Sequence, residues 1–199
     1  MSKTIVGVLR GGPSSEYEVS LQTGASVLKN LNRERYEPRD IFITKNGAWH
    51  LDGFQRGEDY ILHRVDVVFN ALHGEYGEDG KVQRILEHFG TPFTGSHSLP
   101  SAMAMNKVLT KNHIAHLPIK IPRHVVIENF NGGEGLEKKI IEVWKTFIQP
   151  AVVKPMALGS SVGVGIARDF QTFRALILAA LEKSDAALVE EYIKGREAT

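Results

Sequence analysis

A run of serine and glycine residues in the second half of the chain has the composition of a phosphate-binding loop. The run, residues 159–165, reads GSSVGVG and follows Lys154. It lies between predicted strands at 151–155 and 162–167, unlike a Walker A loop or a dinucleotide fingerprint, which joins a strand to a helix. Backbone N–H groups and hydroxyls in such a hairpin can wrap phosphate oxygens, and a lysine adds a point charge. A plain glycine-rich turn beside a solvated lysine is the alternative.

Two adjacent carboxylates occur in the last predicted strand, residues 187–193. They are Glu190 and Glu191. Because neighbouring residues of a strand point to opposite faces, one of the two should face inward. In a nucleotide-binding cleft, backbone groups here could read the adenine edge while a carboxylate accepts hydrogen bonds from ribose hydroxyls. An edge strand whose charges discourage aggregation is the alternative.

The segment 11–20, GGPSSEYEVS, follows the first predicted strand. Ser15 and Glu18 have the spacing of a capping box, which assigns Glu18 to the start of a helix. Glu16 is not needed for that cap. Since open α/β sheets bind ligands at the carboxyl ends of their strands, Glu16 could bind the ammonium group of an amino acid, and we favour this role over the alternative of compensating the helix dipole.

A second glycine-rich segment, HGEYGEDG at 73–80, follows the third predicted strand. Its three glycines indicate a backbone that runs close to a ligand or to another loop. His73 could hydrogen-bond a substrate carboxylate. A structural histidine is the alternative.

The order of the predicted elements gives the fold class. Strands at 4–9, 37–44 and 66–72 alternate with helices at 15–31 and 79–88, which predicts a doubly wound, mostly parallel sheet. After about residue 95 the order changes to a helix at 98–113, then strands and helices of an α+β domain. We therefore expect an N-terminal Rossmann-like domain at 1–95 and the first part of a second domain at 96–199.

The composition excludes several classes of protein. The chain has 199 residues, 42% of them hydrophobic, a formal net charge of +1 and no cysteine. A disordered chain, a disulfide scaffold and a thiolate metal site are excluded. The charge balance does not favour a nucleic-acid or membrane surface, and no signal peptide or membrane-spanning run is present. These features favour a cytoplasmic protein.

Five segments, taken in order, resemble the D-alanine–D-alanine ligase family of the ATP-grasp superfamily. They read GGPSSEYEVS (11–20), HGEYGEDGKVQ (73–83), TGSHSLPSAMAMNK (94–107), VVKPMALGSSVGV (152–164) and VEEYIKGRE (189–197). The resemblance implies a preATP-grasp domain at 1–95, the first part of an ATP-grasp domain at 96–199, and a ligase of peptidoglycan synthesis. ATP would phosphorylate one D-alanine, and the amine of a second would attack the acylphosphate.

The resemblance also implies roles for individual residues. Glu16 and Ser160 would be catalytic, orienting the first D-alanine, with His73 near the same amino acid. The remaining positions would bind ATP: Lys107 and Lys154 the phosphates, Ser160 and Ser161 the phosphate loop, Glu190, Glu191 and Ile193 the adenine, and Glu197 the ribose. The magnesium ligands of the family would lie beyond residue 199, so none is expected in this chain. A homodimer is a further implication.

The chain ends directly after a predicted strand, which we interpret as an incomplete enzyme, inactive by itself because phosphoryl transfer needs the metal. A D-alanine–D-lactate ligase or another ATP-grasp carboxylate–amine ligase is one alternative. A non-catalytic nucleotide-binding protein is another. An unrelated Rossmann-like module would leave the second half unexplained.

Overall fold

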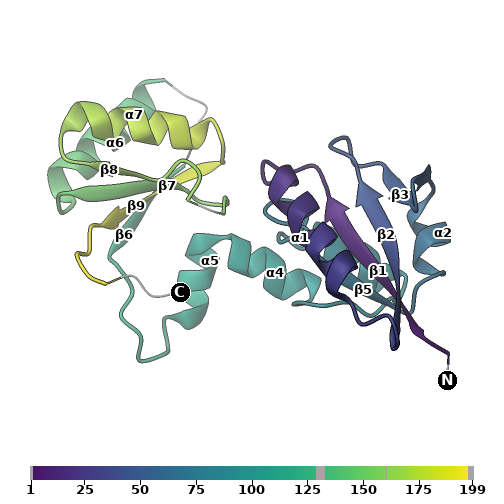
Figure 1. Cartoon of the computed structure of the whole chain (residues 1–199). Helices are drawn as coiled ribbons and strands as arrows, with labels where there is room; N and C mark the ends of the chain where they lie inside the picture. Colours follow the sequence, from purple (N-terminus) through teal and green to yellow (C-terminus); the bar gives the residue numbers. More distant parts are fainter. Residues whose placement is uncertain (1, 129–132, 160, 197–199) are drawn as a thin grey trace. The chain divides into compact units, whose positions relative to one another are not determined.

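The computed structural model describes residues 2–128, 133–159 and 161–196. The chain forms two compact units, Met1–Met105 and Asn106–Thr199 (Figure 1). The assignment of 1–95 and 96–199 as the substrate-side and nucleotide-binding domains stays a prediction.

The first unit is built on a five-stranded sheet. The strand order is β4-β3-β2-β1-β5. The two neighbours of β1 run parallel to it, whereas β3 and β4 add antiparallel pairs at one edge. The strands are β1 (Thr4–Gly11), β2 (Tyr36–Ile43), β3 (Trp49–Leu51), β4 (Phe54–Gln55) and β5 (Val67–Asn70). The predicted doubly wound, mostly parallel sheet is therefore confirmed.

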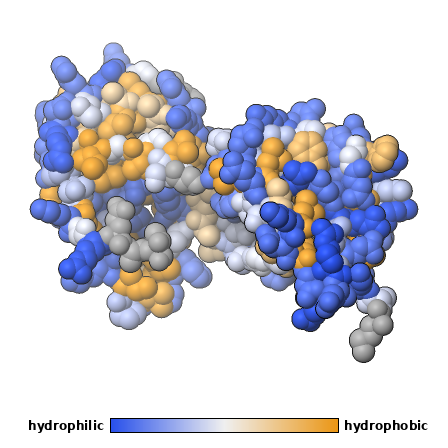
Figure 2. Space-filling view, in the orientation of Figure 1, coloured by the Kyte–Doolittle hydropathy of each residue, from blue (hydrophilic) through white to orange (hydrophobic). Residues whose placement is uncertain are grey.

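Helices cover both faces of this sheet (Figure 1). On one face, α1 (Tyr17–Asn30) packs against alternate residues of β1, such as Val6 and Val8. On the other, α2 (Glu58–Leu62) and α3 (Lys81–His88) pack against Leu9 and its partners. The period-two alternation of β1 thus supplies two cores. The visible surface of this unit is mostly hydrophilic, with apolar atoms in narrow bands (Figure 2).

Two helix boundaries differ from the predictions. The predicted capping box is wrong, because Glu16 is the N-cap of α1 and no side chain caps the helix. The predicted helix at 98–113 is two helices, α4 (Ser98–Met105) and α5 (Lys107–Ile114). Asn106 separates them, because its side chain accepts hydrogen bonds from the N–H groups of residues 108 and 109 and starts a new helix.

The second unit is an antiparallel sheet with two helices on one face (Figure 1). The strand order is β6-β9-β7-β8. The elements are β6 (His124–Glu128), α6 (Glu134–Thr146), β7 (Ala151–Pro155), β8 (Gly165–Ala167), α7 (Phe170–Leu181) and β9 (Ala186–Glu191). The apolar sides of α6 and α7 pack on Val153 and Val189, which are partners in register on β7 and β9. The predicted α+β domain is confirmed.

We expect Ile177→Ala to lower the free energy of unfolding by about 2–5 kcal/mol, because its side chain is fully buried between α7 and the sheet. Ile141→Ala on α6 is the matched control. That side chain is 40% exposed, so its loss should cost about 1 kcal/mol or less. Urea unfolding followed by circular dichroism measures both. Equal costs would contradict the assigned core.

Candidate functional site

A buried carboxylate with two lysine partners lies on the second unit's sheet, on the face that α6 and α7 leave uncovered. Glu190 follows Val189 on β9, so its side chain points away from the α6–α7 core. This side chain is only 7% exposed. Its Oε1 lies 2.7 Å from Nζ of Lys111, and its Oε2 forms an ion pair with Nζ of Lys154. Each carboxylate oxygen therefore has its own ammonium group.

The lysines come from two elements that the backbone holds together. Lys154 is on β7, which is hydrogen-bonded to β9. Lys107 and Lys111 are one turn apart on α5, so they share a side of that helix. The N–H of Lys107 donates to the carbonyl of Met156 at 3.2 Å, and its Nζ donates to the carbonyl of Leu158. The start of α5 is thus fixed to the chain that leaves β7.

The charges of this cluster do not balance. Three ammonium groups, those of Lys107, Lys111 and Lys154, accompany the single carboxylate of Glu190, an excess of two positive charges. Burial and the nearby charge of Lys154 lower the pKa of Lys107, although Glu190 opposes this. Burial alone would raise the pKa of Glu190, but hydrogen bonds from Lys111 and Lys154 outweigh it and hold that pKa below its ordinary value. A partly buried cationic cluster of this kind can bind an anion.

The serine-glycine segment leads out of β7 as a tight turn. Ser161 has a positive φ of 58°, the N–H of Val162 donates to the carbonyl of Gly159, and the N–H of Val164 donates to that of Ser161. Ser161 itself is exposed. The chain that enters this turn contains Leu158, whose carbonyl accepts from Lys107. The turn therefore starts beside one of the cluster's cations.

Of the other predicted nucleotide-binding residues, the structure turns the side chain of Glu191 away from this cluster. Glu191 points to the opposite face from Glu190, where its carboxylate accepts a 2.9 Å hydrogen bond from the N–H of Arg123 and pairs with the guanidinium. Ile193 lies beyond the end of β9 and is 62% exposed. Ser160 and Glu197 lie outside the described residues. Lys111 was not predicted, and its one sequence signal is the four-residue spacing from Lys107.

In the first unit, the loops after β1 and β5 meet at the carboxyl ends of these neighbouring strands. Ser20 joins them, since its buried hydroxyl accepts from the N–H of Gly11 at 2.8 Å and donates to the carbonyl of Ala71 at 2.9 Å. The strand order reverses at β1, which has β2 on one side and β5 on the other. Such a switch point is where doubly wound sheets bind small molecules.

Glu16 and His73 approach each other through Gly74. A Cβ on Gly74 would lie 2.6 Å from Oε2 of Glu16, so the carboxylate rests against the backbone beside His73. Gly74 also has a φ of +69°, which favours glycine. Nε2 of His73 lies 2.9 Å from Oγ1 of Thr23, and its Nδ1 lies 3.8 Å from a carboxylate oxygen of Glu78. A cavity of about 390 Å³ is lined by His73 and Glu78 among others.

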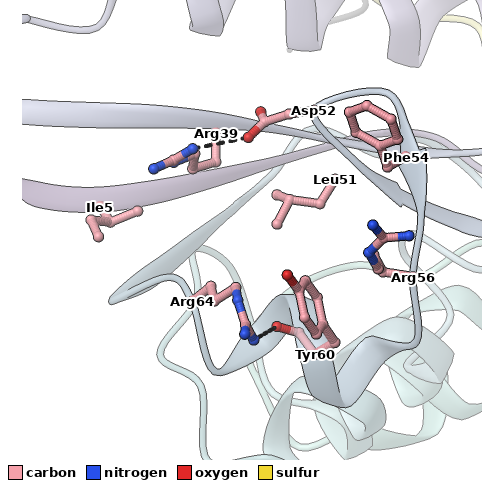
Figure 3. A pocket seen from close by; sticks show the side chains of 8 residues that line it. All are labelled: Ile5, Arg39, Leu51, Asp52, Phe54, Arg56, Tyr60 and Arg64. Atoms are coloured by element: carbon pink, nitrogen blue, oxygen red, sulfur yellow. Dashed lines mark hydrogen bonds and ion pairs between the residues drawn. The ribbon is translucent and has the colours of Figure 1, made fainter.

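A larger cavity, of about 570 Å³, lies against β3, β4 and α2 (Figure 3). It contains none of the predicted site residues. Its cationic side chains are engaged locally. Arg39 pairs with Asp52, and Arg64 stacks on the ring of Tyr60, 3.4 Å from the ring centroid. We therefore assign the chemistry to the two sites above.

Neither a metal cluster nor a membrane span occurs in the part of the chain that the structure describes. No group of three or more His, Cys, Asp or Glu side chains there could hold a metal ion. No described helix is both long enough and apolar enough to cross a bilayer.

Comparisons with known proteins indicate the family of this chain. The family model of the D-ala D-ala ligase N-terminus matches residues 5–61 and 52–96, and that of the C-terminus matches 113–199. The D-alanine–D-alanine ligase of Geobacter sulfurreducens is 39% identical over 197 residues, covering 99% of this chain and 57% of the relative. That of Chlorobaculum tepidum is 34% identical, covering 99% and 64%.

The chain belongs to the D-alanine–D-alanine ligase family.

Solved structures of the family have the same fold. The VanG D-Ala:D-Ser ligase of Enterococcus faecalis has a TM-score of 0.84 and 29% identity, covering 98% of this chain and 64% of its own. The D-alanine–D-alanine ligase of Bacillus anthracis complexed with ATP has a TM-score of 0.74 and 31% identity, covering 96% and 60%. The chain thus spans about 57 to 64% of these family members. The predicted fold class, with its ATP-grasp second domain, is confirmed.

We expect Glu190→Gln to destabilise this family member by about 3 kcal/mol at pH 7, because it leaves two partly buried lysines without their buried counter-charge. The folded-state pKa of Glu190 is lowered from 4.5. Its contribution to stability is therefore complete above that value and is lost as the pH falls through the lower, folded-state pKa. The difference between the variant and the unchanged chain should shrink in the same window.

Glu191→Gln is the matched control for this change. Glu191 pairs with a largely exposed arginine, so the variant should lose much less stability than Glu190→Gln. Urea unfolding at a series of pH values measures both variants. A pH-independent loss in Glu190→Gln would contradict the ion-pair explanation.

Proposed function

We propose that the protein acts in the ATP-dependent ligation of two D-alanines to D-alanyl-D-alanine, a precursor of peptidoglycan. The observation that carries the proposal is the excess of two positive charges around buried Glu190, next to the serine-glycine turn. Family membership supports the substrates, and an ATP complex of the B. anthracis relative supports the nucleotide.

The proposed reaction has two steps. A carboxylate oxygen of the first D-alanine attacks the γ-phosphorus of ATP, the bond to the bridging oxygen breaks, and ADP leaves. The amine of the second D-alanine then attacks the carbonyl carbon of the acylphosphate. Inorganic phosphate leaves with the acyl oxygen, and the amine loses a proton. Negative charge accumulates on phosphate oxygens in the first step, so fixed cations lower its barrier.

In this proposal the second unit binds the nucleotide. Lys107 and Lys154 contact the phosphates, with Ser160 and Ser161 contributing from the turn. Residues 190–193 border the adenine. The carboxylate and the backbone N–H of Glu191 are both engaged by Arg123, so its contact with the base would use neither group. Glu197 binds the ribose.

The first unit binds the first D-alanine. Glu16 pairs with its ammonium group and His73 lies near its carboxylate, with Thr23 orienting the imidazole. Ser160 is the second catalytic residue that the family resemblance implies.

Three further features of the family belong to the proposal. Magnesium would neutralise phosphate charge, but no described residue cluster fits it, so we assign it no ligand and no step. We place the reaction in the cytoplasm, where ATP is available. We also propose a homodimer, as the family resemblance implies.

D-Serine is a second candidate for the second substrate, because the VanG structure, a D-Ala:D-Ser ligase, has a TM-score of 0.84 with this chain. Competition between D-alanine and D-serine, followed by NMR titration, decides between the two amino acids.

We expect Lys107→Met and Lys154→Met each to weaken ATP binding by about 10- to 100-fold, the value of a hydrogen bond to a charged group. The affinity for adenosine should change little in Lys107→Met, since adenosine carries no phosphate. Lys138→Met, which removes an exposed lysine of α6, is the control. Isothermal titration calorimetry at constant salt measures all three. Unchanged ATP affinity in both cluster variants would refute the phosphate assignment.

We expect Gly74→Ala to weaken D-alanine binding by about 10-fold or more, because the new Cβ would displace the Glu16 carboxylate. Gly90→Ala is the control. Gly90 has a similar φ of +64° but nothing within 4 Å of its Cβ position. The control variant therefore has the same kind of backbone strain as Gly74→Ala without a steric clash. An NMR titration with D-alanine measures both. An equal loss in the two variants would mean that Glu16 is not the ammonium site.

A further inference from the structure

Of the two lysines that form ion pairs with Glu190, Lys111 has the less exposed side chain. Its side chain is 13% exposed, against 22% for Lys154, and its Nζ lies 2.7 Å from Oε1 of Glu190. It comes from α5, whereas Lys154 comes from β7. The two lysines thus approach the carboxylate from different elements and use different oxygens.

The charge of the cluster depends on Lys111. Lys107, Lys111 and Lys154 with Glu190 give an excess of two positive charges. Without Lys111 the excess falls to one, and the carboxylate has Lys154 as its remaining ion-pair partner. Because Glu190 would then balance the charge of Lys154, that charge would be less available to a ligand.

We propose that Lys111 is a positioning residue that neutralises Glu190, so that Lys154 and Lys107 direct their charges to the phosphates of the nucleotide. The proposal rests on the proposed ATP site. Lys111 itself touches the carboxylate, not the nucleotide. Its effect should therefore fall on the polyphosphate part of the ligand and leave the nucleoside part unchanged.

A merely structural role makes a different prediction. If Lys111 only stabilised the fold around a buried carboxylate, its loss would weaken adenosine and inorganic triphosphate alike. If it sets the charge of the site, its loss weakens triphosphate alone. Removing the negative charge of Glu190 as well should then restore triphosphate binding, because the excess returns to two positive charges.

The experiment measures binding of inorganic triphosphate, ATP and adenosine to the 199-residue chain by calorimetry at about 0.1 M salt, where exposed charges are well screened. Lys111→Gln keeps a hydrogen-bond donor and removes the charge, Lys111→Arg keeps the charge, and Lys138→Met removes an exposed charge of the same unit. The double variant K111Q/E190Q tests the charge balance with triphosphate, which has no adenine for Glu190 to contact.

We expect Lys111→Gln to bind triphosphate about 10-fold more weakly or worse, consistent with one charge at short range, and to bind adenosine within about 2-fold of the unchanged chain. Lys111→Arg and Lys138→Met should bind triphosphate within about 3-fold of it, and K111Q/E190Q should recover most of the affinity that Lys111→Gln loses. If Lys111→Gln does not fold, the double variant decides: near-normal affinity supports the proposal and a 10-fold loss overturns it.

Other results separate the two proposals. If ATP binding depends on Lys107 but triphosphate binding is normal in Lys111→Gln, the role of Lys111 is refuted and the nucleotide site stands. Equal losses of adenosine and triphosphate also refute it. If the unchanged chain binds neither ATP nor triphosphate, the proposed function and this inference fail together.

Discussion

The shared carboxylate of Glu190 is the interaction on which the nucleotide site depends. A nearly buried carboxylate is costly unless it is paired and hydrogen-bonded. Here both oxygens are paired, one with Lys111 and one with Lys154. The pairs also fix the two ammonium groups, which would otherwise repel each other and Lys107. One negative charge thus allows three positive charges to occupy a small region, and their excess makes the region attractive to phosphate.

The sheet of the second unit decides which face carries this cluster. β9 lies between β6 and β7, so both of its edges are hydrogen-bonded to neighbouring strands. Ala187 and Val189 join the core under α6 and α7, so Leu188 and Glu190, which alternate with them, face the other way. Glu190 falls on that second face, and Lys154 pairs with it there. The hydrophobic packing of α6 and α7 therefore orients the charged residues, because a one-residue shift of register would bury the carboxylate among apolar side chains.

The sequence predicted the parts of this arrangement that follow from local periodicity. Alternation along the last strand required Glu190 and Glu191 to point to opposite faces, and the structure shows that Glu190 is the buried one, on the face opposite the α6–α7 core. The parallel sheet of the first unit followed equally from its alternating strands and helices. The short elements β3, β4 and α2 were missed, because two to five residues carry too little periodicity. The break at Asn106 was missed because the helical pattern continues across it, and only the side-chain cap reveals a second helix. Lys111 was missed for a different reason. A lysine on a helix is usually solvated, and its contact with Glu190 spans residues far apart in the chain.

The excess positive charge of the cluster indicates that the site does not serve stability alone. Burial lowers the pKa of Lys107, which means that its charged form is less favourable in the folded chain than in water. The Leu158 carbonyl and the N-terminal turn of α5 hold it there nonetheless. A bound anion would remove that disadvantage, since it adds negative charge beside Lys107, which Glu190 compensates only in part. Ligand binding would then stabilise the second unit by relieving its repulsion as well as by forming new contacts. An excess of partly buried positive charge thus destabilises the unliganded chain, and a bound phosphate relieves this destabilisation.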